Sequence, residues 1–291
     1  MPEPGGPATP IAIVAGRGGL PRRITEAREA LGLPVYLVIF PECFEDWMAG
    51  YPHGRHEFER LGRLFGELRQ RHVTHVLFAG AMNRPRIRLW RLDLKTITVA
   101  VKAIGLLRKG DDAMLRGYAE MIEAEGFRML GPQDVLGEDM TMPPGTLGRH
   151  GPDAASKSDA ARAAAIVTAL GPHDVGQGAV VANGLCLAVE AIEGTDLMLE
   201  RVGALPVERR AAAPPPSGVL FKGPKPGQDP RLDMPTIGPD TVRGAATAGL
   251  RGIVGIAGET VLLEADEART AADAAGVFVY GASRSEISRW S

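Results

Sequence analysis

The sequence predicts an α/β fold: an N-terminal Rossmann-like parallel-sheet domain, a C-terminal α/β (α+β) domain, and an active site between them. Three observations support this class. Short apolar runs alternate with amphipathic stretches in the first half, a Gly- and Pro-rich stretch then interrupts the pattern, and a different order of strand and helix signals follows. We therefore expect an N-terminal nucleotide- or substrate-binding domain at residues 8–136, a linker at 137–153 and a catalytic domain at 154–286.

The first half alternates strand and helix signals. The apolar run at residues 11–15 ends in glycines, as a buried parallel strand does, and residues 21–31 predict a helix. Apolar residues spaced three and four apart between positions 58 and 68 predict a second helix. The other elements predicted here are strands at residues 35–40, 75–79 and 127–130 and helices at 94–107 and 112–125. This order is typical of a Rossmann-like sheet covered on both faces.

The second half has a different pattern. It begins with a helix at residues 154–170, and the Ala/Pro stretch at 211–216 predicts an exposed loop. Further strands are predicted at residues 178–182, 185–190, 219–222, 253–256, 260–263 and 277–280, and further helices at 240–250 and 266–275.

Composition limits the functional classes. Of 291 residues 45% are apolar, which is enough for a sizeable core. The net charge of −2 argues against a nucleic-acid binder. Two cysteines, Cys43 and Cys186, form neither a disulfide framework nor a zinc site. With no signal peptide and no long apolar run, we expect a cytoplasmic protein. Peripheral contact with the inner membrane and homodimer formation stay open.

The glycines after the first predicted strand are the first candidate site. Gly16, Gly18 and Gly19 stand between a strand and a helix, where backbone N–H groups and the helix N-terminus favour an anion. The pattern is not a complete dinucleotide fingerprint. A tight turn that binds nothing explains the same residues, and both interpretations stay open.

Two further groups lie in the first half. Asn83 and Arg84 follow the third predicted strand, at the sheet edge where ligands bind, and Arg84 could pair with a phosphate. Asp111 and Asp112 precede a predicted helix. They either cap that helix or place a carboxylate near the ligand, with magnesium between the two.

Polar residues around the strands of the second half form another candidate group. These are Asp174 and Gln177, then Glu193, Gly194, Thr195 and Asp196. Oxygen-bearing side chains at this density need partners if they are buried. A sugar, a phosphate with its metal, or a purely structural network would each supply them.

The stretch from Lys222 to residue 238 is the most informative. It carries Lys222, Lys225 and Arg231 with Asp229 and Asp233 among four prolines, so it is neither a helix nor a central strand. Cations in a rigid loop can bind phosphate oxygens, and the aspartates can bind Mg²⁺ or orient a water. A structural loop closed by its own salt bridges is the alternative.

Within this stretch the sequence resembles a known family. Residues 225–238, Lys-Pro-Gly-Gln-Asp-Pro-Arg-Leu-Asp-Met-Pro-Thr-Ile-Gly, are similar to the signature of the LpxI-type UDP-2,3-diacylglucosamine pyrophosphatases. The resemblance extends in matching order from about residue 11 to 281, and includes residues 15–21, 83–85, 110–112, 174, 176–177 and 190–201.

The resemblance implies an activity. Members hydrolyse UDP-2,3-diacylglucosamine to UMP and 2,3-diacylglucosamine 1-phosphate (lipid X) in lipid A biosynthesis, by water attack on the α-phosphorus with magnesium support. It also implies that Asp229 is the key catalytic residue. Near the C-terminus this chain departs from the family, because Ile256 stands where a glutamate is usual.

The roles that we predict follow from the residues and this resemblance together. Catalysis is assigned to Asp229, Gln228, Asp233 and Arg231, with Asp229 and Asp233 as the suggested Mg²⁺ ligands. Whether Asp229 holds a metal, orients the water or acts as a base stays open. Substrate binding is assigned to Gly16, Gly18, Gly19, Asn83, Arg84, Asp111, Asp112, Asp174, Gln177, Glu193, Gly194, Thr195, Asp196, Lys222, Lys225 and Thr236.

Two other functions compete with the hydrolase. The Rossmann-like half suggests an oxidoreductase, although no acidic residue for a ribose ends the second strand. A non-catalytic sensor of UDP-sugars needs no catalytic carboxylate, so it would bind ligand without forming product.

Overall fold

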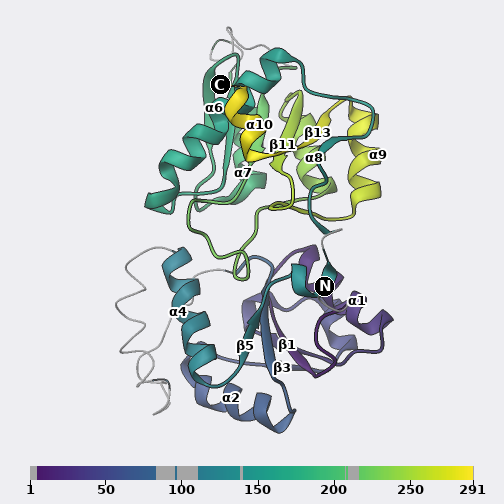
Figure 1. Cartoon of the computed structure of the whole chain (residues 1–291), viewed down its shortest axis with the longest axis vertical. Helices are drawn as coiled ribbons and strands as arrows, with labels where there is room; N and C mark the ends of the chain where they lie inside the picture. Colours follow the sequence, from purple (N-terminus) through teal and green to yellow (C-terminus); the bar gives the residue numbers. More distant parts are fainter. Residues whose placement is uncertain are drawn as a thin grey trace. The chain divides into compact units, whose positions relative to one another are not determined.

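The computed structural model describes residues 5–82, 96, 111–137, 140–206, 208 and 216–290, without the side chains of residues 111–113. The chain forms two compact units (Figure 1). Unit 1 comprises Met1–Gly137 and Asp229–Asp233, and unit 2 comprises Glu138–Gln228 and Met234–Ser291. Each unit contains a sheet covered by helices, so the predicted α/β class is confirmed.

Unit 1 is built on a parallel sheet with the strand order β3-β2-β1-β4-β5. Its strands are β1 (Ile11–Ala15), β2 (Val35–Ile39), β3 (His53–Arg55), β4 (His75–Ala79) and β5 (Arg128–Leu130). The order reverses at β1, so the connections after β1 and β4 leave the sheet on either side of a switch point. Ligands of open α/β sheets bind outside the carboxyl ends of such strands.

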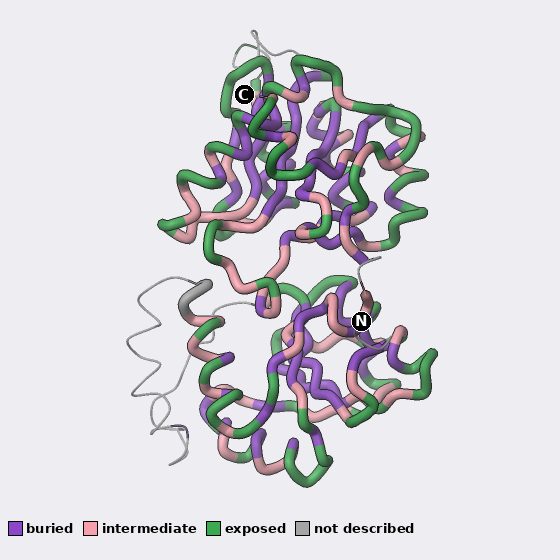
Figure 2. The backbone as a smooth tube through the Cα atoms, viewed as in Figure 1, coloured by how far each residue is buried: buried purple, intermediate pink, exposed green. Residues whose placement is uncertain are grey.

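Helices cover both faces of this sheet. The helices of unit 1 that the structure describes are α1 (Gly19–Ala30), α2 (Leu61–Gln70), α4 (Asp111–Ala124) and α5 (Gln133–Leu136), with short 3₁₀ turns η1 (Pro41–Cys43), η2 (Asp46–Gly50) and η3 (Phe58–Arg60). Apolar residues of α2 and α4 pack with Ala12 and Val14 of β1. Because side chains alternate along a strand, Ile11 and Ile13 face the opposite side, where α1 contacts β1. Strand β1 is accordingly buried along its whole length and β2 and β4 along most of theirs, whereas the edge strands β3 and β5 are partly exposed (Figure 2).

Unit 2 contains a mixed six-stranded sheet with the order β6-β13-β11-β9-β7-β8. The central strands β9, β11 and β13 are parallel, whereas β6, β7 and β8 form antiparallel pairs. The strand bounds are β6 (Gly145–Leu147), β7 (Gly178–Ala182), β8 (Leu185–Val189), β9 (Val219–Lys222), β11 (Gly252–Ile256) and β13 (Phe278–Ala282), and a separate parallel pair is formed by β10 (Thr236–Ile237) and β12 (Val261–Leu262).

The sheet of unit 2 also separates two apolar layers. Helices α7 (Gly194–Gly203), α8 (Pro239–Thr247) and α9 (Ala265–Ala275) pack on one face through Val180, Leu220 and Ile253. Helices α6 (Ala154–Leu170) and α10 (Arg284–Arg289) cover the other face, and the turn η6 (Gly171–His173) follows α6. Asp153 caps the N-terminus of α6, because its carboxylate accepts a hydrogen bond from the Ser156 N–H at 2.8 Å.

Most predicted elements are present, and the differences have local causes. The helices and strands missing from the prediction are β3, α5, β6, α7, β10 and α10, which are all short or begin in sequence rich in turn signals. The Gly at position 194 and its polar neighbours predict a turn after the strand, but Gly194 begins helix α7. The helix predicted at residues 94–107 lies outside the described residues except for Thr96, which is helical. Strand β6 falls inside the expected linker.

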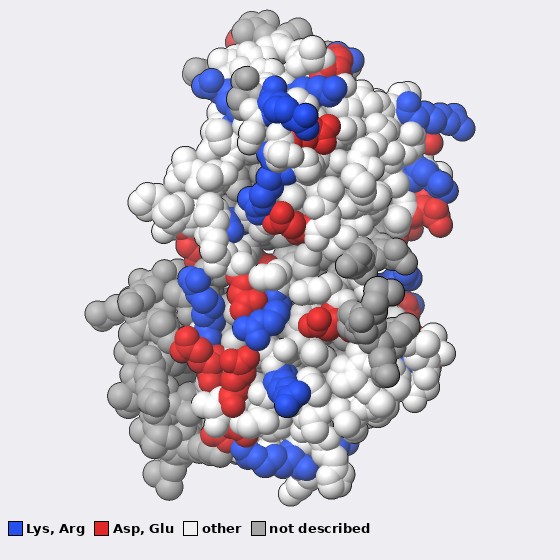
Figure 3. All heavy atoms as spheres, in the orientation of Figure 1, with Lys and Arg blue, Asp and Glu red and all other residues white. Residues whose placement is uncertain are grey.

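No helix among the described residues is long and apolar enough to cross a membrane. On the face of each unit drawn in Figure 3, basic and acidic side chains lie next to one another. This mixture agrees with a net charge of only −2.

Candidate active site

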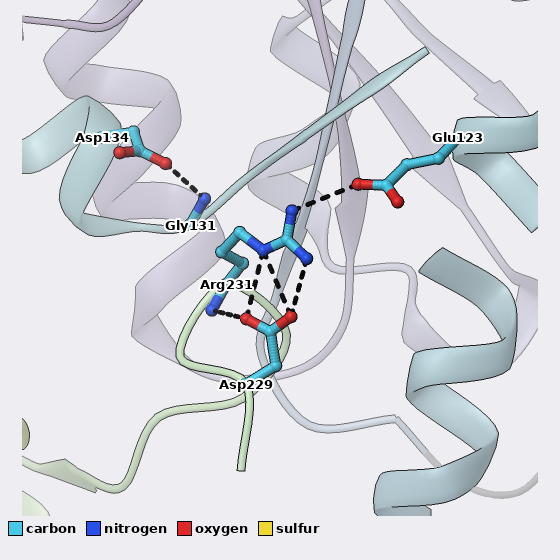
Figure 4. Close-up of polar contacts among 5 residues, drawn as sticks. All are labelled: Glu123, Gly131, Asp134, Asp229 and Arg231. Carbon is cyan, nitrogen blue, oxygen red and sulfur yellow. Dashed lines mark hydrogen bonds and ion pairs between the residues drawn. The ribbon is translucent and has the colours of Figure 1, made fainter. Parts of the chain in front are cut away.

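Asp229 and Arg231 form a fork-shaped ion pair in unit 1 (Figure 4). The Arg231 Nη2 donates to Oδ2 of Asp229 at 2.8 Å, Nε lies 3.2 Å from both oxygens, and the Arg231 backbone N–H donates to Oδ1 at 2.9 Å. The free end of the guanidinium reaches Glu123 of α4 at 3.1 Å. One arginine therefore holds the orientation of Asp229 from two sides.

The ion pair changes the proton affinity of Asp229. Hydrogen bonds from the Arg231 guanidinium lower the pKa of this carboxyl below its ordinary value of 3.8, and they outweigh the opposing effect of partial burial. The same contact raises the pKa of Arg231. Asp229 is therefore ionised at neutral pH and, while the pair is intact, is a weak proton acceptor.

Packing explains why this part of the loop has a defined position. Leu232 is only 6% exposed and belongs to the apolar cluster of unit 1 that also contains Val76 and Met129. The backbone N–H groups of Leu232 and Asp233 donate to the Asp229 carbonyl, which closes a tight turn. Although the prediction counted residues 229–233 in the C-terminal domain, their contacts place them in unit 1. A buried leucine thus anchors the Asp229 turn.

The described residues contain no cluster of side chains typical of a metal site. Among them no group of three or more His, Cys, Asp and Glu side chains lies close enough to hold a metal ion. Both oxygens of Asp229 accept hydrogen bonds from Arg231, and the Asp233 backbone N–H is hydrogen-bonded to the Asp229 carbonyl. Mg²⁺ commonly binds one or two carboxylates together with substrate phosphates and water. The described side chains therefore form no complete magnesium site by themselves, and substrate phosphate oxygens and water would have to complete one.

A second polar group is buried in unit 2. The Lys222 ammonium at the end of β9 donates to the Thr195 hydroxyl at 2.6 Å, and this hydroxyl donates to Oε1 of Glu190 at 2.7 Å. All three residues are less than 9% exposed. A buried lysine and a buried glutamate are thus connected through one hydroxyl, which compensates part of their desolvation.

This network contains acceptors with no partner among the described residues. Oε2 of Glu190 and Oε1 of Gln177 are both buried without a hydrogen bond. A Cβ on Gly178 would lie 2.7 Å from Oε2 of Glu190, and one on Gly176 would lie 2.1 Å from the Glu190 carbonyl oxygen. Glycines on both sides of Gln177 therefore let the backbone approach Glu190. Buried carboxylate oxygens without a donor are costly, which makes this a place for a bound donor such as a hydroxyl group or water.

Glu190 was absent from the predicted site. The family resemblance covers residues 190–201, which include Glu190, but its position at the end of a predicted apolar strand did not single it out as a site residue. Its partners, Thr195 and Lys222, were predicted. Lys222 lies 27 positions after Thr195 in the sequence and reaches it only because β9 and the start of α7 meet in the fold.

The first part of the rigid loop belongs to unit 2. The Lys225 ammonium forms an ion pair with the Asp174 carboxylate, and both side chains are less than 15% exposed. Asp174 has a left-handed backbone conformation, with φ of 53°, at the end of η6. The side-chain amide oxygen Oε1 of Gln228 accepts a hydrogen bond from the Lys225 backbone N–H at 2.9 Å and closes the turn between them. In this structure the Gln228 side chain therefore stabilises the loop.

The predicted glycine loop is a tight turn between β1 and α1. A Cβ on Gly16 would lie 2.6 Å from the Ala81 carbonyl oxygen, and the Arg17 N–H donates to that oxygen at 2.8 Å. Gly18 has a φ of 96° and precedes α1. Its N–H donates to the Glu45 carboxylate at 3.2 Å. A protein carboxylate thus already binds an amide at the helix N-terminus.

The other predicted residues have separate surroundings. Glu193 pairs with Arg201 at 2.6 Å, and Asp196 is exposed in the first turn of α7. The Thr236 hydroxyl donates to the Met234 carbonyl at 3.2 Å. Ile256, at the position of the usual family glutamate, is 3% exposed and belongs to an apolar cluster.

Four predicted residues have no described side chain. Asn83 and Arg84 lie outside the described residues. Asp111 and Asp112 begin helix α4, but their side chains are likewise not described. Within unit 2 the structure brings together Thr195 with Lys222, and Asp174 with Lys225; within unit 1 it brings together Asp229 with Arg231.

Comparison with known proteins assigns the family. The family model described as the LpxI N-terminal domain matches residues 10–138, and that of the LpxI C-terminal domain matches residues 143–280. The UDP-2,3-diacylglucosamine pyrophosphatase LpxI of Caulobacter vibrioides is 40% identical over 271 residues, which are 93% of this chain and 96% of that protein. Both halves are matched in order and nearly in full, so the chain belongs to the LpxI family.

Proposed function

We propose that this protein hydrolyses the pyrophosphate bond of UDP-2,3-diacylglucosamine. The observation that carries the proposal is the 40% identity over 93% of the chain to a protein named for this activity. The ion pair at Asp229, the residue that the resemblance marks as catalytic, supports it. The proposed products are UMP and 2,3-diacylglucosamine 1-phosphate, which is a step in lipid A biosynthesis.

The proposed reaction is a displacement at phosphorus. A water oxygen forms a bond to the α-phosphorus while the bond to the bridging oxygen breaks, and the leaving sugar phosphate keeps the electron pair. Negative charge grows on the leaving phosphate and on the oxygens around the α-phosphorus. Groups already oriented toward those oxygens stabilise this charge best, because they need no reorganisation.

Lys222 and Lys225 are proposed to supply positive charge. Both are mostly buried, and hydrogen bonds from their ammonium groups to Thr195 and Asp174 restrict their positions. A lysine held in a partly dry environment interacts more strongly with a phosphate than one in water. We therefore propose that both lysines bind the phosphate oxygens and that Thr195 positions the Lys222 side chain.

Asp229 is proposed to act as a fixed anion. The lowered pKa that Arg231 causes argues against proton abstraction by this carboxylate while the pair is intact. Orientation of the attacking water requires only an ionised, correctly placed acceptor. Arg231 is the positioning residue in this scheme, and its opposite end is bound by Glu123.

The experiment that tests the function is a single assay. Purified protein is incubated with UDP-2,3-diacylglucosamine in ¹⁸O-labelled water, and the products are examined by mass spectrometry. We expect UMP and lipid X, with the label in UMP because water attacks the α-phosphorus. Label in lipid X would contradict the attacked atom, and no product under any condition, with or without Mg²⁺, would contradict the hydrolase.

The same assay separates the hydrolase from its rivals. A UDP-sugar sensor would retain substrate and release no product. An oxidoreductase would bind NAD(P), which fluorescence titration detects. We further propose a cytoplasmic location; contact with the membrane surface and homodimer formation are tested by vesicle sedimentation and by light scattering.

A further inference from the structure

A basic pocket of about 360 Å³ lies in unit 1, apart from every residue assigned a role above. It is lined by Pro41, Arg55, His56, Glu57, Arg60 and Arg63. Among the described residues that line it, three arginines stand against one glutamate. Such an excess of positive charge in a concave surface attracts anions.

The fold gives this pocket a position typical of ligand sites. Arg55 ends β3, and Pro41 follows β2 by two residues, while β2 and β3 are parallel with Ile39 opposite Arg55. The pocket therefore lies at the carboxyl ends of two parallel strands. Arg63 lies in the first turn of the ten-residue helix α2, which has no acidic residue there. The positive end of the helix dipole adds to the arginine charges.

The arginines are not neutralised by close ion pairs. Arg60 lies 3.6 Å from Glu57, which is long for a hydrogen bond, and both are well exposed. The Arg55 guanidinium carbon lies 4.4 Å from the centroid of the Phe44 ring, and a guanidinium held over an aromatic ring can still donate hydrogen bonds from its N–H groups. Among the described residues Arg63 forms no ion pair. The guanidinium groups of Arg55 and Arg63 can therefore donate to a ligand.

His56 forms a firm inner wall. It is 6% exposed, and its Nε2 lies 3.5 Å from the Tyr36 hydroxyl and 3.9 Å from Glu67. Burial lowers the pKa of His56, and the nearby Arg63 and Arg71 charges act in the same direction against Glu67. The ring is neutral at pH 7, so the anion would be bound by the arginines rather than by His56.

The glycine turn after β1 lies close to this pocket and already contains a carboxylate contact. The turn after β1 is one candidate anion site of this half, and there the Gly18 N–H donates to the Glu45 carboxylate. Arg17 of the same turn donates to the Glu42 carbonyl at 2.8 Å, one residue from Pro41 of the pocket. A second anion beside Glu45 would be repelled, whereas the pocket across this short segment has an excess of positive charge.

We propose that this pocket is a binding site for a phosphate group, carried by a soluble ligand or by a lipid headgroup. Guanidinium groups bind phosphate through paired hydrogen bonds, which Arg55 and Arg63 provide. The proposal does not depend on the reaction above, because it concerns binding in unit 1 without turnover.

The test is binding to the full chain at low salt. Inorganic phosphate and UMP are titrated by calorimetry, and the arginine Nε–Hε signals are followed by NMR. Arg63→Ala and Arg55→Ala should each weaken binding at least about tenfold, as expected for a lost charge-assisted pair. Arg63→Lys keeps the charge but not the forked guanidinium, so its affinity should lie between that of the parent protein and that of Arg63→Ala. Arg23→Ala, an exposed arginine of α1, removes the same charge elsewhere and should have no effect.

The probes also identify the source of the phosphate. Because UMP is also the proposed product, the pocket is read from the affinity that Arg63→Ala removes. A larger loss for UMP than for phosphate indicates a nucleotide, and equal losses indicate the phosphate group alone. Sedimentation with phosphatidylglycerol vesicles that Arg63→Ala abolishes, without binding of either soluble probe, indicates a headgroup. The proposal is wrong if no probe binds the parent protein, or if Arg63→Ala binds every probe as well as Arg23→Ala does.

Discussion

Both carboxylate oxygens of Asp229 accept hydrogen bonds from the guanidinium of Arg231, two positions later in the chain. The pair combines the acid expected to be catalytic with a cation that keeps it ionised. It follows that Arg231 controls the proton affinity of Asp229 as well as its orientation.

Replacement of Arg231 by alanine should raise the pKa of Asp229. The folded-state pKa is now below the ordinary value of 3.8, so the stabilisation by this pair is present above that value and is lost as the pH falls through the folded pKa. In Arg231→Ala the free energy of unfolding should therefore fall less as the pH is lowered. Carboxyl ¹³C NMR titration of Asp229 measures the shift; an unchanged pKa would show that Arg231 does not hold the carboxylate in solution.

Asp229→Asn should abolish turnover while the fold remains. The amide has nearly the same shape but no charge, and a loss of at least about 100-fold in kcat is expected for a group that acts on the attacking water. The melting temperature should change little, because Arg231 is 41% exposed and such pairs contribute only about 0–1 kcal/mol. Asp240→Asn, at an 88% exposed carboxylate, is the control. Normal kcat in folded Asp229→Asn would remove this residue from the mechanism.

The Thr195 hydroxyl should matter for activity more than its size suggests. Thr195→Val keeps the volume but separates Lys222 from Glu190, so we expect about 1–3 kcal/mol of lost stability and a lower kcat. Thr195→Ser keeps the hydroxyl and should restore both. Stability is read from urea unfolding and activity from UMP release. If Thr195→Val loses stability but keeps the parent kcat, the network is only structural.

Magnesium dependence is tested by removal of divalent ions. The family resemblance predicts that excess chelator lowers turnover and that added Mg²⁺ restores it. Since the described residues do not form a metal site alone, binding of Mg²⁺ to the protein without substrate should be weak. Calorimetry with and without a substrate analogue checks this point. Full activity in excess chelator would exclude a metal requirement.

Alanine substitutions at two glycines of unit 1 should change the stability of the protein in opposite directions. Gly16→Ala places a Cβ 2.6 Å from the Ala81 carbonyl oxygen and should destabilise the protein by about 1–3 kcal/mol. Gly66, within α2, has nothing within 4 Å of such a Cβ, so Gly66→Ala should stabilise by about 0.5–1 kcal/mol. Thermal melts compare them. Equal stability of the two variants would contradict the close contact between Gly16, after β1, and Ala81, after β4.

Local patterns in the sequence were sufficient for much of the fold. The apolar run of β1 and the spacing of apolar residues in α2 predicted both elements nearly to their ends, since burial on one or both sides imposes a period on the chain. Short elements such as β3 carry no such period. Strand β3 forms because it can add hydrogen bonds to the edge of β2, and this edge exists only in the assembled sheet.

The sequence alone determined the α/β class, the family and the concentration of charged groups in the loop of residues 222–238. Only the tertiary structure decided which charges meet: Lys222 with Thr195 and Glu190, Asp229 with Arg231 and Glu123, and the arginines of the pocket with one another. The reason is physical. Secondary structure follows from hydrophobic spacing along a few neighbouring residues, whereas the partners of a buried or charged side chain are set by the packing of segments far apart in the chain.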